Sequence, residues 1–277
     1  MMNIDNANDY ARLSRDERTD AREDQSSVSA GPDDAFATMA TDAVTSEKIN
    51  RLIDRIALPC RDLSLGQRLE RLSEQFLATP YQANTLVGSF TEKERLVADF
   101  RGVDCFTLLD YVCALATSRS EHDFFQRLAA IRYQAGDMHF LARNHFFSDW
   151  CAREPANAVD ITATLSPQAI GVTKYLNRKG VDEVYIPGLA IVERRISYIP
   201  TEKIDAAVLA GLYSGDLIGI YAPSPGLDVS HVGFLIKNAD VVYLRNASSL
   251  SHNMKVVDSP LAAYLQNKPG IVVLRLH

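Results

Sequence analysis

Apolar residues recur at helical spacing through the first half of this chain. Between residues 46 and 135 they stand three or four positions apart, the spacing of one buried helix face. This spacing predicts two helices within residues 46–76 that are broken at Pro59, a third over residues 104–117 and a fourth over residues 121–135.

The second half of the chain instead shows alternation of apolar and polar residues, which is typical of strands. It predicts an extended segment over 182–199, strands over 216–221, 229–237 and 241–247, a short helix over 258–267 and a closing strand over 271–276. The second and third of these strands should form a hairpin with its turn at residues 238–240. Helices followed by antiparallel strands predict an α+β domain with the helices packed on an antiparallel sheet.

The first 45 residues have a different composition from the rest. Residues 1–40 hold nine acidic residues and four arginines and almost no large apolar residues. Such a segment buries too little apolar surface to offset its ordering entropy. We therefore predict a disordered polar and acidic tail over 1–45 and one folded domain over 46–277.

Composition narrows the classes of function. The net charge of the 277-residue chain is −6, and the tail contributes −5 of it, so a basic nucleic-acid-binding surface is not expected. No apolar run reaches the roughly 20 residues of a membrane span. The N-terminus lacks the pattern of a secretory signal peptide, which predicts synthesis in the cytoplasm and export, where it occurs, by a dedicated secretion system.

Cys105 is the most informative of the four cysteines. Asp104 before it is a typical helix N-cap, which would place Cys105 at the first helical position. The unpaired N–H groups and the dipole at a helix N-terminus stabilise a thiolate. The alternative is that Cys105 is a small buried apolar residue, as Cys113 is expected to be.

A histidine on a predicted strand could serve as the base for this thiol. In the segment that holds His231, alternation places Val229, His231, Gly233 and Leu235 on one face. Gly233 leaves room for another group beside the histidine. The predicted hairpin brings Asn246 close to His231, and either Asn246 or Ser248 could orient the imidazole.

The segment 138–150 is dense in histidine and aromatic residues and offers a second hypothesis. His139, His145, Asp149 and Cys151 could ligate a metal, but their spacing matches no zinc motif. We therefore expect no metal and no other cofactor. The simpler interpretation is a packed aromatic patch that includes His145 and Trp150.

Several blocks together resemble a known family. The chain resembles the bacterial N-acetylmuramoyl-L-alanine amidase-like family, of the NlpC-type, papain-like cysteine peptidases, over residues 50–277. The residues that carry the resemblance are Thr79-Pro80-Tyr81, Val103-Asp104-Cys105-Phe106-Thr107, Arg143-Asn144-His145-Phe146-Phe147-Ser148-Asp149-Trp150, Tyr198-Ile199-Pro200, Ser214-Gly215-Asp216 and Ser230-His231-Val232-Gly233, followed by Asn246-Ala247-Ser248-Ser249. The chain departs from the family at Phe106, usually small and polar, at Asp110, usually Glu, and at Asn246, commonly His.

The resemblance implies a papain-like fold with a family-specific insertion around residues 120–200. It also implies that Cys105 is the nucleophile, His231 the general base and Asn246 the orienting residue. The residues expected to contact the substrate or the oxyanion are Tyr81, Asp104, Ser230, Ser248, His145 and Trp150. The Cys105 N–H is itself a candidate oxyanion donor.

These features together predict a cysteine amidase that cleaves a peptidoglycan or muropeptide amide, MurNAc–L-Ala by resemblance, through a thioester. The protein would act in muropeptide recycling, or as an injected bacterial effector in the periplasm or a target cell, with an immunity protein or secretion chaperone as partner. One alternative is a cysteine protease or acyltransferase acting on host or competitor proteins. Another is a non-catalytic module that binds cell-wall peptides through the 139–150 patch.

Overall fold

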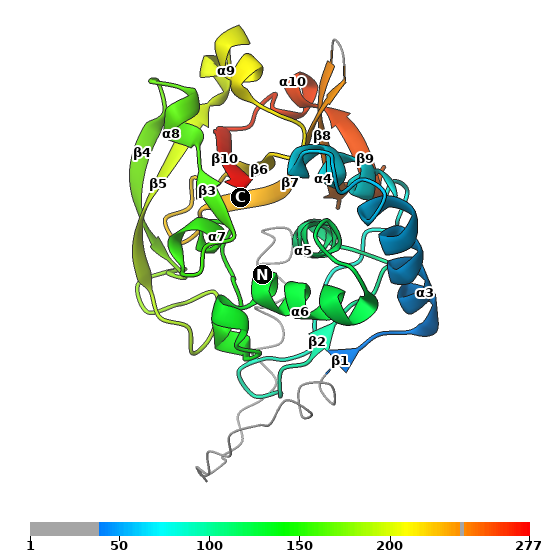
Figure 1. Cartoon of the computed structure of the whole chain (residues 1–277). Helices are drawn as coiled ribbons and strands as arrows, with labels where there is room; N and C mark the ends of the chain where they lie inside the picture. Colours follow the sequence, from blue (N-terminus) through cyan, green and yellow to red (C-terminus); the bar gives the residue numbers. More distant parts are fainter. Residues whose placement is uncertain (1–38, 239–240) are drawn as a thin grey trace, which may run out of the picture.

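The computed structural model describes residues 39–238 and 241–277, and within them the predicted helices form one layer (Figure 1). These helices are α3 (Ala43–Leu52) with the π-helical turn η2 (Ile53–Ala57), α4 (Leu65–Glu74), α5 (Cys105–Leu115) and α6 (Glu121–Arg132). The four predicted helices are confirmed, with the break between the first two at the turn that contains Pro59.

Local capping explains where these helices begin. The carboxylate of Asp42 accepts hydrogen bonds from two backbone N–H groups of α3, and Ser64 and Ser120 cap α4 and α6 in the same way. Every residue of α5 is buried, whereas α4 exposes a polar face. Helix α5 is therefore the central helix of the layer, as its almost entirely apolar sequence requires.

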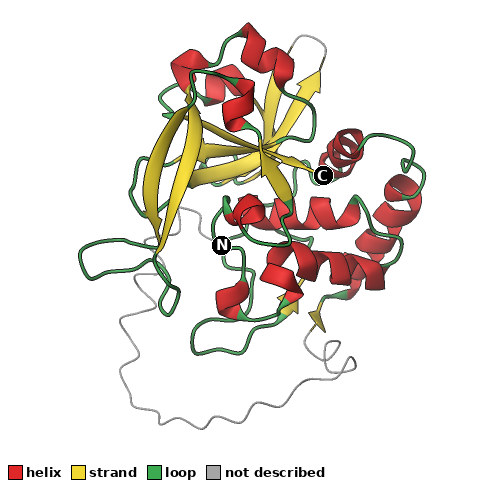
Figure 2. Ribbon diagram, turned by 60° about the vertical axis from the view of Figure 1, so that its left-hand side comes forward, coloured by secondary structure: helices red, strands yellow, loops and turns green. Residues whose placement is uncertain are grey.

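An antiparallel sheet of eight strands in the order β4-β5-β10-β6-β7-β8-β9, with β3 paired to β10, forms the second layer (Figure 2). The strands are β3 (Ala158–Asp160), β4 (Ile170–Leu176), β5 (Val192–Pro200), β6 (Leu217–Tyr221), β7 (Val229–Asn238), β8 (Val241–Ser248), β9 (Lys255–Pro260) and β10 (Gly270–Leu276). Short helices connect them: α7 (Asp149–Ala152), α8 (Thr162–Leu165), α9 (Ala206–Gly211) and α10 (Leu261–Tyr264). The predicted α+β architecture is confirmed.

The strands predicted over 216–221, 229–237, 241–247 and 271–276 are confirmed, and the hairpin pairs Asn238 with Val241. Residues 239 and 240 of its turn lie outside the described residues. The prediction over 182–199 is correct only from Val192, because the Asn177 side chain bonds to the backbone of Ile186 and Leu189 and holds residues 177–191 as a loop. The helix predicted over 258–267 is wrong at both ends: β9 continues to Pro260 in its pairing with β8, and α10 ends at Tyr264.

Apolar residues cover both faces of the sheet. One core packs α5, α4 and α6 against Val232, Phe234 and other residues of one face. The second core lies on the opposite face, where α9 and α10 cover Leu235, Leu244 and their neighbours. A strand such as β7, buried on both faces, therefore has a nearly continuous apolar sequence.

Residues 39–45 already belong to the folded part of the chain. Met39–Ala40 (β1) pairs in parallel with Leu96–Val97 (β2), and α3 follows directly. The remainder of the predicted tail, residues 1–38, lies outside the described residues. Among the described helices none is long and apolar enough to cross a membrane.

Candidate active site

Cys105 is the first residue of α5, and Asp104 is its N-cap, as the sequence predicts. The Thr107 N–H donates to Asp104 Oδ1 at 2.7 Å, and the Asp104 N–H donates to Thr107 Oγ1 at 2.9 Å. This reciprocal pair fixes the first turn of the helix. Cys105 therefore lies at the positive end of a rigid, buried helix.

The segment with Tyr81 connects this helix start to the sheet. The Val103 N–H donates to the Pro80 carbonyl, and the Gln82 N–H donates back to the Val103 carbonyl, both at 3.0 Å. On its other side the segment pairs with the chain at Met254 and Lys255, where β9 begins. Tyr81 thus lies between the residues that precede Cys105 and the strand next to β8.

Helix α5 packs directly against β7 and β8, the strands that carry His231 and Asn246 (Figure 1). One detail of the predicted strand is wrong. The pairing of β6 with β7 shifts between Ile220 and Tyr221, a β-bulge that moves Val229 into the core containing Phe234, whereas Leu235 packs on the opposite face. Val229 and Leu235 therefore do not share a face.

A buried hydrogen bond joins the two strand residues: His231 Nε2 and Asn246 Oδ1 are 3.0 Å apart. The amide orientation is determined by its other end, where Asn246 Nδ2 donates to the Leu244 carbonyl at 3.1 Å and to Ser259 Oγ at 3.3 Å. Because Oδ1 can only accept, Nε2 carries the hydrogen. The neutral imidazole is then the tautomer whose Nδ1 can take a proton.

Gly233 makes this pairing possible. A Cβ atom at this position would lie 2.6 Å from the Arg245 carbonyl oxygen and 3.1 Å from the Asn246 Cβ. The sequence predicted that the glycine leaves room for a neighbouring group, and the structure identifies this group as Asn246 and its strand.

The two serines have other partners. Ser248 Oγ accepts from Asn253 Nδ2 at 3.2 Å and from the Leu250 N–H at 3.4 Å, whereas Ser230 Oγ donates to the Ile220 carbonyl at 3.3 Å. Asn246 is a residue whose side chain bonds to His231.

Tyr264 is a neighbour of His231 that the sequence did not indicate. Its ring centroid lies 6.2 Å from that of the imidazole, with an angle of 29° between the ring planes. It belongs to the short helix α10, far from the other site residues in sequence, and no motif marks it.

His145 and Trp150 are buried in the core. Both side chains are at most 1 % exposed, and His145 Nε2 donates to the Phe140 carbonyl at 2.8 Å. Burial holds the pKa of His145 well below its usual value, so the ring is neutral. The two residues offer no surface to a substrate in this structure, and the aromatic patch is part of the packing.

The 139–151 segment also does not assemble a metal site. Within residues 39–238 and 241–277 no three His, Cys, Asp or Glu side chains converge closely enough to hold a metal ion. Asp149 instead forms an ion pair with Arg194 at 2.7 Å, and Cys151 Sγ donates to the Ser148 carbonyl. Burial raises the pKa of the Cys151 thiol to about 12.

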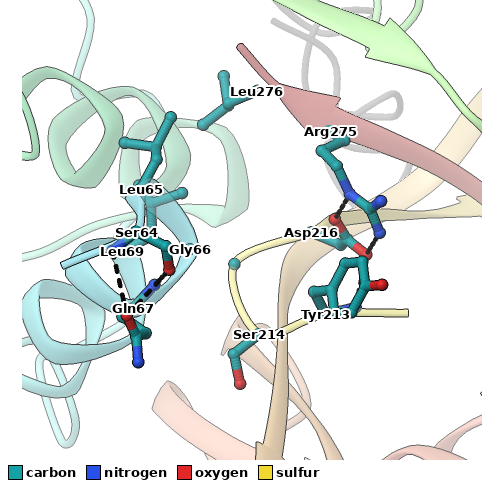
Figure 3. Close-up of a pocket in the computed structure, with 11 residues that line it drawn as sticks. Ser64, Leu65, Gly66, Gln67, Leu69, Tyr213, Ser214, Asp216, Arg275 and Leu276 are labelled. Carbon is teal, nitrogen blue, oxygen red and sulfur yellow. Dashed lines mark hydrogen bonds and ion pairs between the residues drawn. The ribbon is translucent and has the colours of Figure 1, made fainter. Parts of the chain in front are cut away.

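A cavity of about 490 Å³ lies between the start of α4 and the turn before β6 (Figure 3). None of the predicted catalytic or substrate-contacting residues lines it. Its charged groups neutralise each other, because Arg275 donates two hydrogen bonds of 2.7 Å to Asp216. We do not assign chemistry to it.

The helix-borne cysteine and the His231–Asn246 pair are the groups that a thiol-dependent hydrolase requires. The chain belongs to the AmiA-like, N-acetylmuramoyl-L-alanine amidase-like family, whose family model matches residues 71–271. The family indicates a hydrolase of the peptidoglycan amidase type. A search of curated proteins gave no significant match.

Solved structures share the fold, and one of them is named an amidase. The chain is similar to an N-acetylmuramoyl-L-alanine amidase from Bacteroides uniformis ATCC 8492, with 29 % identity, a TM-score of 0.65, and coverage of 76 % of this chain and 98 % of that one. It is also similar to a putative xylanase from Bacteroides fragilis, with 29 % identity, a TM-score of 0.62, and coverage of 74 % and 99 %. Protein LPG0564 from Legionella pneumophila shares the fold at 22 % identity, with a TM-score of 0.69 and coverage of 85 % and 97 %.

Proposed function

We propose that this protein is a cysteine amidase of the papain-like, NlpC-type class that hydrolyses an amide bond in peptidoglycan or muropeptides. The bond we propose is MurNAc–L-Ala, with a peptide bond of the stem as the close alternative. The observation that carries the proposal is the His231–Asn246 hydrogen bond on the strands against which the Cys105 helix packs. Membership of an amidase-like family supports the choice of substrate class.

The proposed reaction begins with transfer of the Cys105 thiol proton to His231 Nδ1. Asn246 Oδ1 holds the hydrogen on Nε2, so Nδ1 is the basic atom and the imidazolium that forms keeps a hydrogen-bond acceptor. The thiolate is stabilised by the N-terminal dipole of α5. Both residues are almost completely buried, and low polarity around them strengthens these interactions.

The thiolate then attacks the amide carbonyl to form a tetrahedral oxyanion, for which the Cys105 N–H is a donor in our proposal. The C–N bond breaks as His231 Nδ1 returns its proton to the leaving amine. A water molecule, deprotonated by the same nitrogen, attacks the thioester and releases the carboxylic acid and the Cys105 thiol. Tyr81 lies beside the residues that lead into α5 and is our candidate for contact with the substrate.

Mass spectrometry of muropeptides and sacculi incubated with the protein tests this proposal. Cys113→Ala is a matched control for Cys105→Ala, because Cys113 lies two turns later in the same helix and burial raises the pKa of its thiol well above the usual value. We expect products from the wild type and from Cys105→Ala none above background. Cys113→Ala should remain active.

The products also distinguish the alternatives. Free stem peptide and sugar would identify the MurNAc–L-Ala bond, and shortened stems would identify a peptide bond. Undiminished hydrolysis by Cys105→Ala would refute the mechanism. A folded wild type that binds muropeptides without turnover would refute the amidase and favour a binding module.

A further inference from the structure

A second cavity, of about 340 Å³, lies at the C-terminal end of α5, between the first turn of α4 and the middle of α6. Its walls carry four arginines, Arg61, Arg68, Arg119 and Arg127, from four separate segments of the chain. The sequence has no basic run there, so only the fold brings these side chains together.

The positive charge of this arginine cavity is largely uncompensated. Arg127 forms an ion pair with Asp123 at 2.9 Å. The guanidinium groups of Arg61, Arg68 and Arg119 form no ion pair within the described part of the chain, although the Arg119 backbone N–H donates to Asp123 Oδ2 at 2.9 Å. Three guanidinium charges are therefore left without an acidic partner. Like charges gathered at one concave surface repel one another and attract an anion.

The Arg68 side chain is held in place by one hydrogen bond and has a second, buried donor group. Arg68 donates to the Ala116 carbonyl at 2.8 Å, a favourable cap for the C-terminus of α5. Its Nε is buried and makes no hydrogen bond to any described residue. Capping of α5 therefore explains the hydrogen bond from Arg68 to Ala116. It does not explain the buried Arg68 Nε–H group or the presence of Arg61 and Arg119 in the cavity.

We propose that the arginine cavity binds a small ligand through a phosphate group. Guanidinium groups donate paired N–H bonds that match the geometry of phosphate oxygens, and several arginines together suit a doubly charged group. A volume of about 340 Å³ is at the lower end of the range for small-molecule sites. The ligand is therefore inorganic phosphate or a small phosphomonoester.

This site is separate from the proposed amidase site. Cys105 is the first residue of α5, whereas the cavity lies just beyond Leu115 at the other end. A helix of this length spans roughly 16 Å, so both ligands can be bound at once. Failure of one proposal leaves the other unaffected.

Isothermal titration calorimetry of the full chain with inorganic phosphate tests the proposal. Arg61→Gln and Arg119→Gln are suitable variants because both side chains are exposed and their loss should not unfold the protein, as thermal melts would check. Arg178→Gln, also exposed but outside the cavity, is the matched control for loss of one charge.

We expect saturable binding to the wild type, to Arg178→Gln and to Cys105→Ala, and a loss of affinity of about tenfold or more in each cavity variant. Tighter binding of glycerol phosphate than of inorganic phosphate would show that the ligand is a phosphomonoester. Equal affinities would show that the phosphate group alone is recognised. Absence of saturable binding, equal affinity in all variants, or equally tight binding of succinate would overturn the proposal.

Discussion

Removal of the Asn246 side chain is the sharpest test of the proposed site. In Asn246→Ala the His231 Nε2–H loses its acceptor at 3.0 Å, in a place where both residues are buried. A buried donor without a partner costs about 1–3 kcal/mol. If the transition state is destabilised by this amount of free energy, kcat for muropeptide hydrolysis decreases by about 5- to 150-fold.

The separate effects of Asn246→Ala on kcat and on KM show whether Asn246 positions His231 or binds the substrate. Asn246 is fully buried beneath His231 and is not available to the substrate, so KM should change little. Asn246→Asp retains an acceptor for Nε2 and should be more active than Asn246→Ala. Urea unfolding of each variant would separate a loss of fold from a loss of activity.

Ser248→Ala is the matched control, because Ser248 lies two residues further along β8 and bonds to Asn253 instead of His231. It should retain kcat close to that of the wild type. Unchanged kcat in Asn246→Ala, or a larger loss in Ser248→Ala, would refute the assignment of Asn246 as the residue that orients His231.

Three further changes test other parts of the structure. Gly233→Ala places a Cβ 2.6 Å from the Arg245 carbonyl and should reduce the free energy of unfolding by about 1–3 kcal/mol, whereas Gly180→Ala, with 3.5 Å of space, should be tolerated in the same urea titration. Burial holds the pKa of His145 well below its usual value, so the folded state excludes the proton that the unfolded chain binds. The free energy of unfolding should therefore fall by about 1.4 kcal/mol per pH unit below about pH 6.5. In urea unfolding, His145→Gln should lose this dependence on pH. Asp228→Asn removes one of two carboxylate oxygens that accept from the Ser148 and Val229 N–H groups at 2.7 Å, and should lower both the melting temperature and kcat because this contact holds the start of β7.

The helices could be predicted because their signals are local. The caps Asp104 and Ser120 stand next to the residues that they cap, and the apolar spacing lies within each helix. The strand β4 has no comparable signal. Its Lys174 can be buried because the ammonium group donates to the carbonyls of Ala222 and Ser224. These partners are about fifty residues away in the chain, so the sequence of β4 does not reveal them.

The register of strand pairing was the main feature of the candidate site that the sequence could not predict. Alternation correctly placed His231 beside Gly233, and the short hairpin correctly brought Asn246 to it. The bulge that turns Val229 to the other face depends on the pairing of β6 with β7, which the sequence of β7 alone does not contain. Tyr264 and the arginine cavity were missed for the same reason, because each is assembled from distant segments.

Helix α5 explains how such distant segments can form a precise site. All its residues are buried, and the fully buried ion pair of Asp110 with Arg132, at 2.8 Å, ties its middle to α6. A shift of α5 would break this pair and expose apolar surface, and loss of one partner of a buried ion pair is strongly destabilising. Helix α5, with Cys105 at its start, is therefore held against β7 by the whole core. We expect that substitutions at Arg132 will lower activity through misplacement of Cys105, although Arg132 is fully buried and pairs with Asp110.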